Sequence, residues 1–341
     1  MLTPRAAAFL LLALSRAPAC TVPVFRYALD RWPAETWTLE APRTAFTTEP
    51  LATALRNLGG NSPLNLSAKP WPDSTQKDAR LSFPATGDPG TAWTGPLTPE
   101  SLAQLVDSPA RQELARRILS GDSLVWVIVQ SADAAANDAL TARIQKRLTF
   151  VQNAAELPAI DPDDPSSRLG PGPELKLQFS QFSVRRDEKK EAAFIAMLAG
   201  PQGGAMLQAG APFAAVVFGR GRVFGAWPVD ELTDERLDQT NLFVTRACSC
   251  EVKSLHPGWD LLMNVDWDDA LRKAQDSRNA PPTALLTGPP PSATPVLVPI
   301  APGIAPAAPA EPKSGWPLVA GIAALIVTVA GIFFIRRKPA L

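Results

Sequence analysis

The sequence predicts an α/β fold, and three patterns in its central part lead to that prediction. Leu124–Val129 is an apolar run rich in β-branched residues, typical of a central strand buried on both faces. A long helix is expected over residues 136–157. Its apolar face is formed by Leu140, Ile144, Leu148, Val151 and Ala155. A hairpin is expected where Gly219-Arg220-Gly221 joins strands over 213–218 and 222–227.

The remaining elements of this part follow the same periodicities. Alternating residues predict a strand over 175–184, after a Pro-, Asp- and Gly-rich loop over 158–173. Helices are expected over 188–199 and 233–247. Residues 121–247 therefore have the predicted order β-α-β-α-β-β-α.

This order resembles the thioredoxin fold. In thioredoxin-like proteins a cis-proline opens the strand next to the active site, and Pro212 holds that position before the strand at 213–218. Thioredoxins also carry Cys-x-x-Cys where the first strand meets the first helix, whereas this chain has Ser131-Ala132-Asp133-Ala134. Because the thiolate is the nucleophile of disulfide exchange, we expect no such reaction at this place.

The region before this core is predicted to be an N-terminal α/β extension over residues 20–100. A helix is expected at 24–29, a strand at 36–40 and a second helix at 51–58, while the Pro-, Ser-, Asp- and Gly-rich residues 61–97 indicate irregular structure. Residues 101–278 form the expected thioredoxin-like domain, with an additional helix over Pro109–Leu119 near its start.

The amino-terminal end has the features of an export signal, expected over residues 1–19. Arg5 precedes an apolar run, and Ala17-Pro18-Ala19 forms a small-x-small cleavage site before Cys20. The apolar run is too short to span a bilayer. A short buried helix is the structural alternative. Lipidation of Cys20 is a further alternative, although a lipoprotein signal usually has a larger apolar residue at the position of Ala17.

The carboxy-terminal end predicts a single transmembrane helix over residues 316–335. Pro317–Ile335 is uncharged, and its 19 residues would span about 28 Å as a helix. Arg336, Arg337 and Lys338 favour a cytoplasmic tail at 336–341. A Pro/Ala-rich linker over 279–315 precedes the helix, with 11 prolines between Pro281 and Pro312. Residues 20–315 are then expected outside the cytoplasm.

The ectodomain also resembles an uncharacterised family of bacterial exported, membrane-anchored proteins. The resemblance rests on Cys20–Leu29, Asp107–Arg111, Ser123–Trp126, Phe218–Arg222, Cys248–Lys253 and Pro257–Leu262. It implies export to the bacterial cell envelope and one folded unit, and it implies no mechanism.

The charge balance excludes some function classes. The chain has 33 basic and 33 acidic residues, but its ends contribute five basic residues and no acidic ones. The ectodomain therefore carries 28 basic and 33 acidic residues, a net charge of −5. This argues against a nucleic-acid partner, because such binders present a basic surface. The expected contacts are an unknown protein in the envelope and the membrane itself, through the carboxy-terminal helix.

Cys248-Ser249-Cys250 is the sharpest chemical feature of the sequence. Cys20, Cys248 and Cys250 are the candidate residues for a structural disulfide or a redox-active thiol. Together with His256, Cys248 and Cys250 could also ligate a soft metal ion, although a structural zinc site usually needs four ligands.

The other motifs have simpler structural interpretations. Gly219–Arg222 fits a hairpin turn better than a phosphate loop. Asp268 and Asp269 fit the first turn of a helix. No complete catalytic constellation or cofactor motif is evident. We therefore expect a binding or assembly module rather than an enzyme; the alternative is a thiol–disulfide oxidoreductase or metal-binding protein that uses Cys248 and Cys250.

Overall fold

A computed structural model describes residues 21–59, 63–73, 75–84, 90–248 and 253–279. By its contacts the chain divides into a unit of residues 1–286 and a unit of residues 287–341, and all described residues belong to the first. The expected signal peptide and membrane span lie outside the described residues. Within the described part, no helix is both long and apolar enough to cross a membrane.

The described residues form a mixed α/β fold with two mixed sheets, which confirms the α/β part of the prediction. The larger sheet has the strand order β6-β5-β7-β8-β9. Its strands are β5 (Leu124–Gln130), β6 (Phe179–Arg185), β7 (Phe213–Phe218), β8 (Arg222–Pro228) and β9 (Trp259–Asp260). β5 runs parallel to β6 and antiparallel to β7, and β8 is antiparallel to both of its neighbours. The predicted hairpin is therefore confirmed.

β5 lies in the middle of this sheet and is buried on both faces, as its sequence predicts. Val125, Val127 and Val129 belong to one hydrophobic cluster. Leu124, Trp126 and Ile128 belong to a second cluster on the opposite face. Since successive side chains of a strand point to opposite faces, a continuous apolar run is what a strand between two helical layers requires.

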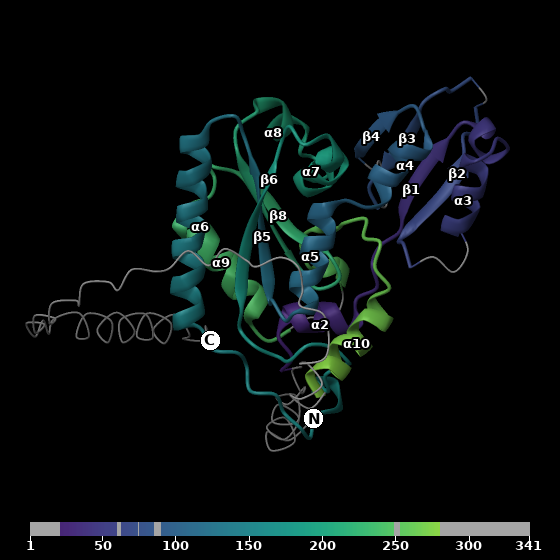
Figure 1. Ribbon diagram of the computed structural model, residues 1–341. Helices are drawn as coiled ribbons and strands as arrows, with labels where there is room; N and C mark the ends of the chain where they lie inside the picture. Colours follow the sequence, from purple (N-terminus) through teal and green to yellow (C-terminus); the bar gives the residue numbers. More distant parts are fainter. Residues whose placement is uncertain (1–20, 60–62, 74, 85–89, 249–252, 280–341) are drawn as a thin grey trace, which may run out of the picture. The chain divides into compact units, whose positions relative to one another are not determined.

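Helices cover both faces of the larger sheet (Figure 1). One layer contains α2 (Val24–Arg31), α6 (Ala134–Ala154) and α9 (Asp234–Thr245), and their apolar residues share a cluster. The other layer contains α5 (Pro109–Leu119) and α7 (Ala192–Ala199), whose apolar residues belong to the cluster of Val125, Val127 and Val129. The predicted face of α6 is buried at Leu140, Ile144, Leu148 and Val151, whereas Ala155 lies just beyond the helix end and is only partly buried.

The smaller sheet corrects the expectation that residues 61–97 are irregular. It has the order β2-β1-β3-β4, with β1 at Trp37–Ala41, β2 at Leu66–Pro70, β3 at Ala79–Ser82 and β4 at Thr91–Gly95. The three unexpected strands have only four or five residues, and in β2 only Leu66 is buried. Such short strands contain too few alternations to show a period of two. Around this sheet lie η1 (Arg43–Phe46), α3 (Leu51–Gly59) and α4 (Pro99–Val106).

Several boundaries also differ from the sequence-based expectation. β6 begins at Phe179 rather than at Leu175, and the α-helix expected from Glu188 begins at Ala192 after the 3-10 turn η3 (Lys189–Glu191). The remaining elements are η2 (Pro165–Ser167), α8 (Gly204–Ala209), η4 (Lys253–Leu255) and α10 (Trp267–Asn279). Asp268 and Asp269 lie in the first turn of α10, as predicted.

Candidate functional site

The turn between β5 and α6, which contains Ser131 and Asp133, is held together by side-chain hydrogen bonds. The Ser131 N–H donates to Asn137 Oδ1 over 2.9 Å, and Asn137 Nδ2 donates to the Ser131 carbonyl over 2.9 Å. Asp133 caps α6 by accepting from the Ala136 N–H at 3.0 Å. These bonds fix the turn between strand and helix. None of the groups hydrogen-bonded to Ser131 is a base that could activate its hydroxyl as a nucleophile.

This turn borders a hollow of about 540 Å³, which we call the corner. Its lining is formed by residues 130–132, 134, 137–138 and 185–187. The two cations, Arg185 and Arg186, behave differently. Arg185 pairs with Asp187 at 2.6 Å, and both side chains are largely exposed. Such a pair contributes little to stability, so it is available for exchange with a partner's charges.

Arg186 is the more constrained cation of the corner. Its Nη1 donates to the Leu207 carbonyl at 3.2 Å and its Nη2 to the Ala211 carbonyl at 2.6 Å. The guanidinium carbon lies 5.5 Å from the ring centre of Phe213, and Nε is buried with no hydrogen-bond partner among the described residues. Burial lowers the pKa of Arg186. Arg186 therefore ties α8 and the loop before β7 to the end of β6.

Pro212 is buried in this region but does not carry the predicted cis bond. The cis peptide bond of the described residues lies between Glu49 and Pro50, not before Pro212. The assignment of Pro212 as a cis-proline is therefore wrong. Its place directly before β7 agrees with the sequence, but the isomer cannot be read from one X-Pro pair, since trans is the more stable form for almost any residue that precedes proline.

The predicted cysteine site is described only in part. Cys248 is 1% exposed and lies in the hydrophobic cluster of the α6 face. Its N–H donates to the Val22 carbonyl at 2.9 Å, next to an antiparallel bridge between Pro23 and Ala247. Cys20 and Cys250 lie outside the described residues. The chain segment that follows Cys20 is thus held beside Cys248.

His256, the third predicted metal ligand, is buried among aromatic rings. Its ring centre lies 4.8 Å from that of Trp32 and 5.8 Å from that of Phe243. Its backbone carbonyl accepts a hydrogen bond from Arg222 at 2.9 Å. Within the described ranges, no group of three or more His, Cys, Asp or Glu residues is placed to hold a metal ion. The predicted set of Cys248, Cys250 and His256 cannot be assembled from those residues alone.

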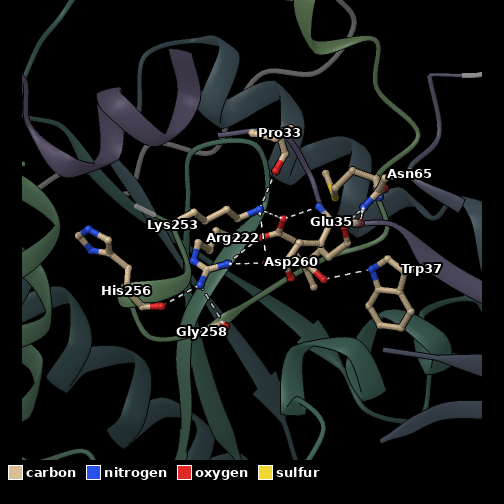
Figure 2. A network of polar contacts seen from close by, with 11 residues as sticks. Pro33, Glu35, Trp37, Asn65, Arg222, Lys253, His256, Gly258 and Asp260 are labelled. Atoms are coloured by element: carbon tan, nitrogen blue, oxygen red, sulfur yellow. Dashed lines mark hydrogen bonds and ion pairs between the residues drawn. The ribbon is translucent and has the colours of Figure 1, made fainter. Parts of the chain in front are cut away.

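A polar network around Asp260 buries charged groups of both signs (Figure 2). Arg222 Nη1 donates to Asp260 Oδ1 at 3.0 Å, and Lys253 pairs with Asp260 Oδ2. The Glu35 N–H also donates to Oδ2, at 2.7 Å. Asp260 is thereby surrounded by donors, which is the condition under which a carboxylate tolerates burial.

The same network joins the two sheets. Trp37 Nε1, from β1, donates to the Asp260 carbonyl at 3.1 Å. Asn65 Nδ2 donates to the carbonyls of Glu35 and Leu261, and Asn65 Oδ1 accepts from the Met263 N–H. Burial and the negative charge of Asp260 raise the pKa of Glu35, against the opposing effect of Lys253 and Arg222. We assign this network a structural role, because the Asp260 carboxylate is paired on both oxygens, although Arg222 Nε has no hydrogen-bond partner among the described residues.

The partnership of Arg222 and Asp260 was not predicted from the sequence. Both lie in segments that carry the resemblance to exported bacterial proteins, Phe218–Arg222 and Pro257–Leu262. Their charges are visible in the sequence. That Arg222 pairs with a carboxylate 38 residues later, however, can be known only from the register of the sheet.

The chain matches no protein-family model, and no curated protein shows significant similarity to it.

Proposed function

We propose that this protein is a membrane-anchored binding or assembly module of the bacterial cell envelope, whose folded part lies outside the cytoplasm and is thioredoxin-like without the usual Cys-x-x-Cys. The location rests on the signal peptide, the linker and the carboxy-terminal span predicted from sequence. The resemblance to bacterial exported proteins supports the same location.

The arrangement of the larger sheet supports the thioredoxin-like part of the proposal. In the order β6-β5-β7-β8 the first two strands in sequence are parallel neighbours, and the hairpin that follows is antiparallel to them. α6 and α9 pack on one face, while α7 packs on the other. This matches the predicted β-α-β-α-β-β-α order, in which the last helix returns to the face of the first.

The observation that carries the binding function is the chemistry of the corner. The turn after β5 positions Ser131 and Asn137 at a hollow of about 540 Å³, with exchangeable charges on Arg185 and Asp187. No cysteine is among the residues that line it. A thioredoxin-like corner in this form can bind a protein segment, but it lacks the thiolate that disulfide exchange needs.

Site-specific photo-crosslinking in a bacterial host tests this function. A photoreactive residue would replace Ala132, an exposed residue of the corner, in the full-length chain. We expect a discrete crosslinked product of defined mass in the cell envelope. Lys146, an exposed residue farther along α6, is the matched control and should give no such product. Equal products from both positions, or none from either, would contradict a partner at the corner.

The alternative function is a thiol–disulfide oxidoreductase or a metal-binding protein that uses Cys248 and Cys250. The deep burial of Cys248 in an apolar cluster disfavours it, since reactive cysteines are partly exposed and near positive charges. Insulin reduction by the purified full-length chain separates the two functions. If the chain reduces insulin and Cys248→Ser does not, the oxidoreductase is supported and the binding module is contradicted. If the chain binds stoichiometric zinc or copper and Cys248→Ser loses it, the metal site is supported.

A further inference from the structure

One edge of the larger sheet is left partly uncovered. β9 pairs with β8 only at Arg222–Asp260 and Val223–Trp259, although β8 continues to Pro228. Phe224–Pro228 therefore has no strand partner on this side among the described residues. An uncovered strand edge presents free backbone N–H and C=O groups, which can pair with another chain.

The start of β9 is set by the turn that precedes it. Gly258 has a φ of 107°, and a Cβ atom there would lie 1.9 Å from the Val223 carbonyl oxygen. Coming from His256, the chain therefore makes its close approach to β8 at Gly258, directly before β9 begins. On the side of β9, no described strand lies next to β8 from Phe224 onward.

A hollow of about 790 Å³ lies along this uncovered edge, and we call it the edge groove. It is lined by residues 224–231 of β8 and the following turn, by Trp259, and by eight of the residues between Ala199 and Ala211 around α8. Ala226, Met206 and Trp259 border the cluster on one face of the sheet, whereas Phe224 and Trp227 border the cluster on the other. Lining from both faces is expected of a groove that follows a strand edge.

The edge groove has an apolar body and one charged end. Trp259 is fixed in its wall, because its Nε1 donates to the Met197 carbonyl at 2.7 Å. The charged residues of the lining are Asp230 and Glu231, both exposed and neither in an ion pair with another described residue. No Lys or Arg is among the lining residues. The groove thus complements an apolar segment that carries a positive charge at one end.

We propose that the edge groove binds an extended apolar segment of a partner protein, which adds a strand to β8 and places a basic residue beside Asp230 and Glu231. Strand addition supplies backbone hydrogen bonds, while alternate side chains enter the groove. This inference deepens the proposed binding function and rests on it, but the edge groove and the corner have no lining residue in common.

The direction of the added strand follows from the sheet. Both neighbours of β8 are antiparallel to it, and the added segment continues the row of β9. An antiparallel segment has its amino-terminal end beside Pro228, and Asp230 and Glu231 follow directly. The basic residue is therefore at the amino-terminal end of the segment.

The charges disfavour two other occupants. Between Pro281 and Pro312 the Pro/Ala-rich linker has Glu311 as its single charge, and its one cation, Lys313, lies two residues after that carboxylate, close to the predicted membrane span. Its prolines also lack amide donors. A second copy of the chain would bring another groove whose lining contains no Lys or Arg.

Binding of synthetic peptides to the full-length chain, purified in a mild detergent, tests the proposal. The probes are fluorescently labelled peptides of alternating Val and Thr, about seven residues long, with Lys first or Lys last. We expect the Lys-first peptide to bind about fivefold more tightly than the Lys-last peptide at low salt, with the difference lost at high salt. Equal affinity of the two peptides, or no binding of either, would overturn the proposal.

Backbone N-methylation of the Lys-first peptide tests strand addition itself. Alternate amides of an edge strand point toward the neighbouring strand and away from it. Methylation of one alternate set of amides should therefore abolish binding, whereas methylation of the other set should leave it nearly unchanged. Loss of binding with both sets, or with neither, would exclude strand addition.

Substitutions in the chain locate the binding surface. Asp230→Asn with Glu231→Gln should remove the preference for Lys-first and leave Lys-last binding unchanged. Asp163→Asn with Asp276→Asn, two exposed carboxylates outside the groove, is the matched control and should change neither. Met206→Gln should weaken both peptides. If crosslinking at Ala132 fails while these peptide results hold, the corner is rejected as the partner site and the edge groove remains the proposed binding surface.

The other occupants give distinct results. If deletion of residues 281–312 tightens peptide binding several-fold, the linker occupies the groove and the proposal is wrong. If light scattering shows a dimer that Met206→Gln dissociates, a second copy occupies it and the proposal is likewise wrong.

Discussion

Arg222 Nη1 lies 3.0 Å from Asp260 Oδ1, and the two side chains are only 5% and 3% exposed. The pair joins the last residue of β9 to the first residue of β8, so it fixes the register between these two strands. Lys253 and the Glu35 N–H complete the shell of donors around the carboxylate. One buried anion thus organises the amino-terminal sheet, the loop before β9 and the sheet edge.

Asp260→Asn should destabilise the protein strongly. The substitution removes the charge that Arg222 and Lys253 share, and breaking a buried ion pair on one side costs about 3–5 kcal/mol. Urea unfolding of the full-length chain, followed by tryptophan fluorescence, measures the change. Asp269→Asn, which breaks an exposed pair with Lys273 on α10, is the control and should destabilise the protein far less, because solvent screens an exposed pair. Similar losses for both variants would show that the Asp260 network is not a major determinant of stability.

Arg111→Lys should destabilise the protein although it keeps the positive charge. Arg111 is 1% exposed and donates from its guanidinium to the carbonyls of Leu105, Gln104 and Leu262. Burial lowers its pKa to about 10, so the group stays protonated at neutral pH. A lysine cannot reach the same carbonyls with one ammonium group, and each buried carbonyl left without a donor costs about 1–3 kcal/mol.

The matched control for Arg111 lies on the same helix. Arg116 is an exposed arginine of α5 that pairs with Glu113, and Arg116→Lys should change the free energy of unfolding by less than about 1 kcal/mol. Thermal unfolding of the two variants in parallel measures the difference. If the two changes in melting temperature were equal, the three carbonyl contacts of Arg111 would contribute no more than a surface pair.

The sequence predicted those parts of the fold in which one element contains enough residues to show its period. β5 and α6 are examples, because six apolar residues in succession and an apolar face over four turns leave few alternatives. β2, β3 and β4 were missed because each has only four or five residues. Their stability comes from cross-strand partners, such as Leu39 opposite Leu81, that no local pattern reveals.

The candidate site was predictable to a smaller extent. The missing cysteine pair at Ser131–Ala134 follows from the sequence, because strand β5 and helix α6 locate the turn between them. The edge groove does not follow from the sequence, because it depends on where β9 begins. The close approach of Gly258 to Val223 decides that point. Likewise, His256 is buried between Trp32 and Phe243, and Trp32 is more than 200 residues away from it along the chain.

The stability of the protein should fall at acidic pH in part because of Glu113. Hydrogen bonding to Arg116, together with Arg117, lowers the pKa of Glu113 from its usual 4.5 to about 2. A carboxylate with a lowered pKa in the folded state contributes stability above its unfolded pKa and loses it as the pH falls through the folded value. The contribution is therefore complete above pH 4.5 and declines toward pH 2.

Glu113→Gln tests this linkage. At pH 6 the variant should be less stable than the parent by about 1 kcal/mol or less, because the ion pair is partly exposed and screened. The difference should shrink as the pH falls below 4.5. Urea unfolding at several pH values measures it, with Glu235→Gln, an exposed carboxylate on α9, as the control. A difference that stays constant with pH would show that Glu113 does not titrate differently in the folded protein.

Restoring a cysteine pair at the corner should create a disulfide reductase if the domain is thioredoxin-like. Ser131→Cys with Ala134→Cys places two thiols three residues apart across the start of α6, where the helix dipole favours a thiolate. We expect insulin reduction about tenfold above that of the parent chain, since the reactive thiolate fraction rises as the thiol pKa falls. Lys146→Cys with Thr149→Cys has the same spacing on exposed positions of the same helix and lacks the helix start. Activity in the control pair alone, or equal activity in both pairs, would mean that the corner has no thioredoxin-like character and that the likeness is confined to the order of the strands.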